Sequence, residues 1–265
     1  MRGFIISRMD CIITAGGIPG PEDPIYTYTQ GQSKALLDMN GRTMLERVVD
    51  ALQGSRYIDD IVIVGLGHDH DQQFQRPVHH APDHGGLFSN GLAGVAWLRQ
   101  HKGEIGHILV CSGDIPAITS SQIDAHIESC QPLDKSLYYT FATRQVVEAR
   151  FPQSNRTYIK LKGLEIAGGD IVVADPTITD HNRELWTALT EARKHAWKLA
   201  SIVGLPILLK LLFRQLTLQD IERKATSILG QPTQVVLTPY AELAMDVDKP
   251  RQVEMLRQFL SDHGQ

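Results

Sequence analysis

Short apolar runs alternate with amphipathic stretches along the N-terminal half of the chain. Residues 11–14 form a continuous apolar run of the kind that a strand buried on both faces shows. Residues 45–52 instead repeat their apolar side chains at helical spacing, and Thr43 with Glu46 predicts a capping box in front of them. A second apolar run at 61–64 completes the pattern of a right-handed βαβ unit.

The same alternation continues toward the C-terminus. Apolar runs at 107–111 and 137–141 predict two more strands, and Thr119 with Gln122 caps a helix between them. Residues 156–175 predict an antiparallel segment whose end rejoins the sheet. Residues 234–237 predict a last strand before a terminal helix. The expected fold is α/β: a three-layer α/β/α sandwich around a mostly parallel, Rossmann-like sheet.

Residues 182–230 read as helical and interrupt this alternation. One helix face is marked by Leu185, Leu189, Ala192, Ala196 and Leu199. The apolar stretch 205–216 lies within residues 199–218, which are too interrupted by Lys210 and Arg214 to span a bilayer. A membrane-surface helix and a dimer face stay open, but a buried core helix is the expectation. We expect one domain over residues 1–265, with this helical part inserted before the last strand.

Composition limits the class of partner. The 265 residues are 42% hydrophobic and 21% charged, which is ordinary for a soluble globular protein. A net charge of −4 without a Lys/Arg-rich run argues against nucleic acid as a partner. Three cysteines without metal-ligand spacing predict reduced thiols and a cytoplasmic protein, and the apolar run before Arg8 is too short for a signal peptide.

A His- and Asp-rich stretch at 67–86 is a second place where metal chemistry has to be considered. Its histidines are His68, His70, His79, His80 and His84. No cysteine set of the kind that a zinc site uses lies nearby. A solvated loop with a short strand near Val78 is the expectation.

The first apolar run ends in Ala15-Gly16-Gly17, and a Pro/Gly-rich polar loop leads from there to Lys34. Glycines at the end of a strand let backbone N–H groups approach a phosphate chain, and a lysine adds a point charge to the same anion. Asp114 follows the third apolar run, at the sheet edge where open α/β folds bind ligands. Mg²⁺ needs only one or two such carboxylates together with phosphate oxygens.

Five motifs in this order resemble the MobA-like nucleotidyltransferases, which belong to the wider GT-A type group with the sugar-nucleotide pyrophosphorylases. They are Ala-Gly-Gly at 15–17, Lys-x-Leu-Leu at 34–37, Gly-Leu-Ala-Gly at 91–94, Gly-Asp-Ile-Pro at 113–116 and Asp-Val-Asp-Lys-Pro at 246–250. The resemblance covers most of the chain and weakens between residues 182 and 230. It implies a GT-A type sheet with a C-terminal helical insertion.

The resemblance also implies roles for individual residues. Lys34 and Asp114 would be catalytic, and Asp114 with Asp248 would bind Mg²⁺. Gly169 and Asp170 would contact the acceptor. The nucleotide would lie against Ala15, Gly16, Gly17, Lys34, Asn90, Gly91, Leu92, Ala93 and Gly94. Asp248 has a second interpretation as the N-cap of the last helix, and Asp114 as a residue that stabilises the turn before Pro116.

The loop at 18–32 departs from the family pattern. It contains Glu22 and Asp23 but neither Arg nor Lys, and Ser33 rather than proline precedes Lys34. A cation from elsewhere, such as Arg42, would have to pair with the triphosphate.

The predicted function is a Mg²⁺-dependent nucleotidyltransferase that moves NMP from an NTP to a phosphorylated small-molecule acceptor and releases pyrophosphate. Phosphoryl chemistry of this kind depends on positioning and charge stabilisation rather than on covalent help. One alternative is a GT-A glycosyltransferase, against which the single aspartate of Ser112-Gly113-Asp114 argues. The other is an inactive nucleotide or sugar-phosphate binding protein, which the loop without arginine favours. No transmembrane segment is predicted, and a homodimer stays open.

Overall fold

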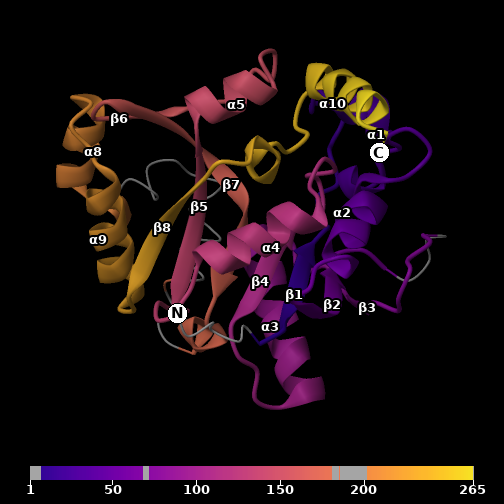
Figure 1. Ribbon diagram of the computed structural model, residues 1–265, viewed down its shortest axis with the longest axis horizontal. Coiled ribbons are helices and arrows are strands. Elements are labelled where there is room, and N and C mark those ends of the chain that lie inside the picture. Colours follow the sequence, from indigo (N-terminus) through magenta and orange to yellow (C-terminus); the bar gives the residue numbers. More distant parts are fainter. Residues whose placement is uncertain (1–6, 68–71, 181–184, 186–201, 265) are drawn as a thin grey trace.

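The computed structural model describes residues 7–67, 72–180, 185 and 202–264, and its centre is one mixed sheet (Figure 1). The strand order is β3-β2-β1-β4-β7-β5-β8, with β6 paired to β7 outside this path. The strands are β1 (Met9–Thr14), β2 (Ile58–Val64), β3 (His79–Ala81), β4 (Ile108–Ser112), β5 (Leu137–Thr143), β6 (Ile159–Leu161), β7 (Leu164–Ala174) and β8 (Thr233–Thr238).

The N-terminal half of the sheet is parallel, as the apolar runs predict. β1 pairs in parallel with both β2 and β4, and β2 with β3. β7 runs antiparallel to β4 and β5, whereas β5 and β8 are parallel. The predicted antiparallel segment is therefore confirmed as the β6–β7 hairpin, and the α/β, mostly parallel, Rossmann-like sheet is confirmed with it.

Helices cover both faces of the sheet. Alternate residues of β1 enter opposite cores: Cys11 and Ile13 pack with α2 (Met44–Gln53) and α4 (Ser120–Ser129), and Ile12 packs with α3 (Leu87–Lys102). This two-sided burial is the reason why β1 reads as a continuous apolar run. The capping boxes at Thr43 and Thr119 are confirmed, and each fixes the first residue of its helix.

The last helix, α10 (Pro250–Asp262), closes a third core. It packs with α1 (Tyr26–Thr29) and α5 (Arg144–Arg150), as the apolar cluster of Ile25, Val147, Leu256 and their neighbours shows (Figure 1). This packing attaches the polar loop after the first strand to the C-terminal end of the chain.

The part of the chain that the structure describes also contains short 3₁₀ helices at Lys34–Leu36, Pro176–Thr179 and Ala241–Ala244.

The helical part before β8 contains α8 (Leu205–Leu212) and α9 (Leu218–Leu229), which stand at the β8 end of the sheet (Figure 1). The prediction of a buried core helix in the stretch 205–216 is wrong, because α8 has no buried residue. Its neighbour α9 is amphipathic and packs on β8 through Ile221 and Val235. The helix predicted from Leu185 to Leu199 lies outside the described residues, apart from Leu185.

Within the described ranges, every helix falls short of the length and apolar character that a bilayer crossing requires.

Candidate active site

The glycine turn after β1 leaves no room for a side chain at Gly16. A Cβ atom there would lie 2.4 Å from Oδ1 of Asp83 and 2.8 Å from Nδ2 of Asn90. Asn90 in turn donates to Asp83 at 2.8 Å and accepts from the backbone N–H of His84 at 2.7 Å. The start of α3 and the turn after β1 therefore form one connected wall.

Lys34 lies at the glycine turn because two hydrogen bonds fold the polar loop back on itself. The backbone N–H of Lys34 donates to the carbonyl of Gly17 at 2.9 Å. The hydroxyl of Ser33 donates to the carbonyl of Ala15 at 2.7 Å. Ser33 thus has a structural role at the position where proline is usual in the family pattern.

Asp114 and Asp248 meet at this lysine. The Lys34 ammonium lies 2.6 Å from Oδ2 of Asp114 and 2.6 Å from Oδ1 of Asp248. Burial alone would lower the pKa of Lys34, but the two carboxylates outweigh it and raise that pKa above its ordinary value. Lys34 therefore stays charged, and it joins two residues that are far apart in sequence.

The backbone brings Asp248 to the end of β4. The N–H of Val247 donates to the carbonyl of Asp114 at 3.2 Å. Gln252 accepts from the backbone N–H groups of Asp248 and Lys249 through its side-chain oxygen, at 2.8 and 2.9 Å. The residue at the N-cap position is Lys249, so the Asp248 carboxylate is directed to Lys34 instead of capping α10.

Asp246 is a carboxylate that the sequence-based prediction missed. It belongs with Asp114 and Asp248 to a group in which one carboxylate oxygen of each residue lies within 4.8 Å of those of the other two. The Asp-Val-Asp spacing contained a signal for it, since residues i and i+2 of an extended segment point to the same side. The candidate metal centre therefore has three carboxylates rather than two.

Arg156 is a second missed residue, and it supplies a cation beside the carboxylates. Its guanidinium forms ion pairs with Asp246 and, at 3.7 Å, with Asp170. The segment around it is attached to α10, because Lys249 Nζ donates to the carbonyl of Asn155 at 2.6 Å. No local sequence pattern could have found Arg156, since long-range contacts place it: its guanidinium also donates to the carbonyl of Gly168 at 3.1 Å, and Gln252 donates to the carbonyl of Ser154 at 3.0 Å.

Asp170 faces the same group from the middle of β7. Burial, and then the nearby charge of Asp114, raise the pKa of Asp170 to about 7. Gly169 beside it lies against Thr140, where a Cβ atom would be 2.8 Å from the threonine Cβ. Asp170 thus adjoins the carboxylate group, whereas the tight space at Gly169 accounts for its lack of a side chain.

A cavity of about 470 Å³ opens in front of the glycine turn and ends at Asp114. Its lining residues are Thr14, Ala15, Gly16, Gly17, Ile18, Lys34, Ala35, Asp83, Gly85, Gly86, Leu87, Asn90, Ser112, Gly113 and Asp114. The structure thus brings together Ala15, Gly16, Gly17, Lys34, Asn90 and Asp114 of the predicted residues.

The segment Gly91–Gly94 follows this wall along α3 and does not line the cavity. A Cβ atom at Gly94 would lie 2.6 Å from the side chain of Ile12, so this glycine allows α3 to approach β1. Residues 83–90 form the cavity wall on this side instead.

The charged residues at the Asp114 end of the cavity fit a divalent cation. The carboxylates of Asp114, Asp246 and Asp248 exceed the charges of Lys34 and Arg156 by one, and by two when Asp170, with its pKa of about 7, is also ionised. Among the described residues, Oδ2 of Asp170 is buried without a hydrogen bond. Carboxylate oxygens are the ligands that Mg²⁺ prefers, and the excess negative charge matches its charge.

Arg42 does not supply the cation that the polar loop lacks. Its guanidinium pairs with Asp50 at 2.9 Å and donates to the carbonyl of Gln73 at 3.1 Å. It is not part of the cavity lining. Arg156 is the arginine that adjoins the carboxylates.

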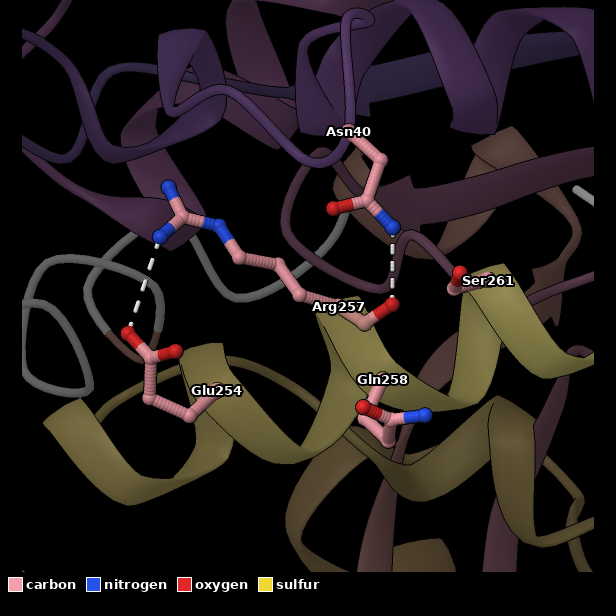
Figure 2. A pocket seen from close by; sticks show the side chains of 5 residues that line it. All are labelled: Asn40, Glu254, Arg257, Gln258 and Ser261. Atoms are coloured by element: carbon pink, nitrogen blue, oxygen red, sulfur yellow. Dashed lines mark hydrogen bonds and ion pairs between the residues drawn. The ribbon is translucent and has the colours of Figure 1, made fainter.

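A second hollow lies between the turn at Asn40 and the outer face of α10 (Figure 2). Its polar groups are engaged with one another: Asn40 Nδ2 donates to the carbonyl of Arg257 at 2.7 Å, and Arg257 pairs with Glu254 at 3.6 Å. Gln258 and Ser261 complete the lining. None of the carboxylates at the glycine turn belongs to it, so the candidate active site is the cavity that ends at Asp114.

Comparisons with known proteins identify the family of the chain. The family model of the MobA-like NTP transferase domain matches residues 27–233. A search of curated proteins found no match. A structure titled a hypothetical transferase from Thermus thermophilus shares 32% identity over 93% of this chain and 99% of its own, with a TM-score of 0.79.

Two further solved structures show the same fold at low identity. One is CMP:2-keto-3-deoxy-manno-octonic acid synthetase complexed with CTP, with 12% identity over 97% of this chain and 99% of that chain and a TM-score of 0.54. The other is 2-C-methyl-D-erythritol 4-phosphate cytidylyltransferase from Thermus thermophilus, with 15% identity, coverage of 96% and 99%, and a TM-score of 0.51.

The match of this family model over most of the chain, together with the Rossmann-like sheet, identifies a nucleotidyltransferase. The chain belongs to the family of MobA-like NTP transferase domains.

Proposed function

We propose that the protein is a Mg²⁺-dependent nucleotidyltransferase that transfers NMP from an NTP to a phosphorylated small-molecule acceptor and releases pyrophosphate. The observation that carries this proposal is the pairing of Lys34 with both Asp114 and Asp248 at the mouth of the glycine-walled cavity. A polyanion and a divalent cation would meet at that point.

The nucleotide would lie in the cavity, with its phosphates along the backbone of Ala15, Gly16 and Gly17. The absence of a side chain at Gly16 lets Asp83 and Asn90 pack against the turn, and Gly17 has open space around it. Lys34 would direct its charge at the phosphates and stabilise the negative charge that develops on the leaving pyrophosphate.

Asp114, Asp246 and Asp248 would hold the Mg²⁺ ion. When bound, Mg²⁺ would neutralise phosphate charge and make the α-phosphorus more electrophilic. Arg156 would keep Asp246 in place through their ion pair. The acceptor would approach from the side of Gly169 and Asp170, so that its phosphate oxygen attacks the α-phosphorus in line with the leaving pyrophosphate.

The test is a screen of the four NTPs with Mg²⁺, first for thermal stabilisation and then for pyrophosphate release with sugar 1-phosphates, alcohol phosphates and a molybdopterin-type cofactor. Lys34→Ala and Asp114→Ala should each abolish pyrophosphate release. The exposed pair of Lys135 and Asp134 offers matched controls, Lys135→Ala and Asp134→Ala, which should retain full activity.

Each other outcome has a defined meaning. Unchanged turnover in both Lys34→Ala and Asp114→Ala would refute the assignment. Release of a nucleoside diphosphate from a nucleotide sugar would indicate a glycosyltransferase instead. Tight NTP binding without product for any acceptor would indicate a binding protein that has lost the chemistry.

A further inference from the structure

Helix α8 presents apolar side chains to solvent. Leu205 and Leu212 are 66% and 73% exposed, and Phe213 directly after the helix is 68% exposed. Leu209 and Leu211 are also exposed. We name these five residues the α8 face. Single exposed leucines are ordinary on protein surfaces, but five large apolar side chains within nine residues mark an interaction site.

The polarity of α8 is inverted relative to an ordinary surface helix. Its charged residue, Lys210, reaches back to the buried carboxylate of Asp220 at 2.7 Å. Ile207 packs toward the cluster around Phe141 and Leu216. The helix is thus attached to the body of the protein while its leucines point outward, in contrast to the usual arrangement in which the charged face is solvated.

Basic residues outnumber acidic ones in the segment that carries the α8 face, although Lys210 and Arg223 both pair with Asp220. The segment 205–224 contains the basic residues Lys210, Arg214, Arg223 and Lys224 but only two acidic ones, Asp220 and Glu222. The β6–β7 turn adjoins it, because the backbone N–H of Lys162 donates to the carbonyl of Leu216 at 2.9 Å. Residues 160–165 and 205–224 together contain six basic and three acidic residues, with Glu165 near Arg214, so this end of the molecule (Figure 1) has an excess of positive charge in a chain whose net charge is −4.

An apolar face could bind a second copy of the chain or a membrane surface, and the positive charge beside the α8 face distinguishes between them. In a two-fold dimer built on the α8 face, the same basic residues would approach one another, and like charges across an interface are unfavourable. An anionic bilayer surface instead offers headgroups to the basic residues and acyl chains to the leucines and the phenylalanine. The observed combination matches the bilayer surface.

We propose that the α8 face binds the surface of an anionic membrane, with α8 in the plane of the interface. Leu205, Leu212 and Phe213 enter the boundary between headgroups and acyl chains, while Lys162 and Arg214 lie near the lipid phosphates. This contact is independent of the proposed transfer reaction, because none of its residues lines the nucleotide cavity.

The test is co-sedimentation of the full-length protein with vesicles of phosphatidylcholine alone or mixed with phosphatidylglycerol. The wild type should sediment with the mixed vesicles, weakly with neutral ones, and less as salt is raised. The double variant Leu212→Ser/Phe213→Ser should reduce the bound fraction about tenfold or more, since it removes two inserted side chains. Both positions are exposed, so its melting temperature should match that of the wild type.

Charge variants distinguish binding through the α8 face from a general electrostatic attraction of the protein to anionic vesicles. Arg214→Glu should weaken binding to the anionic vesicles, whereas Arg8→Glu, an exposed position at the start of β1, should not. Failure of the wild type to bind anionic vesicles would overturn the proposal, as would equal effects of the two variants. A dimer in light scattering that Leu212→Ser/Phe213→Ser converts to monomer, without vesicle binding, would assign the face to a second copy instead.

Discussion

Replacing Lys34 by methionine removes the central cation of the site while keeping a side chain of similar length. The wild-type lysine side chain is 17% exposed, and its ammonium lies between Asp114 and Asp248, at 2.6 Å from each. In Lys34→Met, Arg156 is the cation that remains in contact with this group of carboxylates. We therefore expect two changes: lower stability without metal, and a larger response to Mg²⁺.

The size of the first change follows from the burial of the two partners. Removing one partner of a fully buried ion pair costs about 3–5 kcal/mol. The Asp114 side chain is 13% exposed, but that of Asp248 is 56% exposed and is screened by water. We expect a loss of about 2–3 kcal/mol in the free energy of unfolding, which for a chain of this size lowers Tm by about 4–10 °C.

The assay is thermal unfolding of wild type and Lys34→Met in EDTA and then in increasing Mg²⁺. Because the variant binding site is more negative by one charge, Mg²⁺ should stabilise it more than the wild type and close about half of the Tm gap. Lys135→Met is the matched control, since Lys135 pairs with Asp134 at the surface and its loss should leave Tm nearly unchanged.

Two results would refute this reasoning. Equal Tm values in EDTA would mean that Lys34 does not offset the negative charge of the Asp114 and Asp248 carboxylates. Equal Mg²⁺ shifts in wild type and variant would mean that these carboxylates do not hold the cation.

Three further predictions concern other parts of the chain. Gly16→Ala places a methyl group 2.4 Å from the Asp83 carboxylate and should raise the Kd for NTP roughly tenfold, measured by calorimetry, while Gly17→Ala, with open space around it, should not. Burial lowers the pKa of His126 to about 4. As the pH falls, His126 is therefore protonated in the unfolded protein before it is protonated in the folded protein. Stability should therefore drop by about 3 kcal/mol between pH 6.5 and 4, and His126→Gln should lose this dependence in urea titrations; an unchanged slope would contradict it. Thr43→Ala removes the hydroxyl that caps α2 and should cost about 1 kcal/mol of unfolding free energy, against no change for an exposed helix position such as Gln258→Ala.

The order of strands and helices was predictable because each element carries its own local pattern. β1 reads as apolar on both faces, and Thr43 with Glu46 closes a capping box within four residues. The glycine turn, Lys34 and Asp114 were predictable for a related reason, since open α/β sheets place ligands after the ends of their strands. Asp248 was predicted as a metal ligand, and the structure brings its carboxylate to Lys34, beside Asp114.

What the sequence by itself determined was the set of elements and the residues at the ends of β1 and β4. Tertiary structure decided that Arg156 joins Asp246 and Asp170, because that position depends on hydrogen bonds between the segment around Asn155 and α10. It also decided that α8 turns its leucines outward, against the expectation of a buried helix. Periodicity shows that a helix has an apolar face but not what that face contacts, because contact depends on residues distant in the chain.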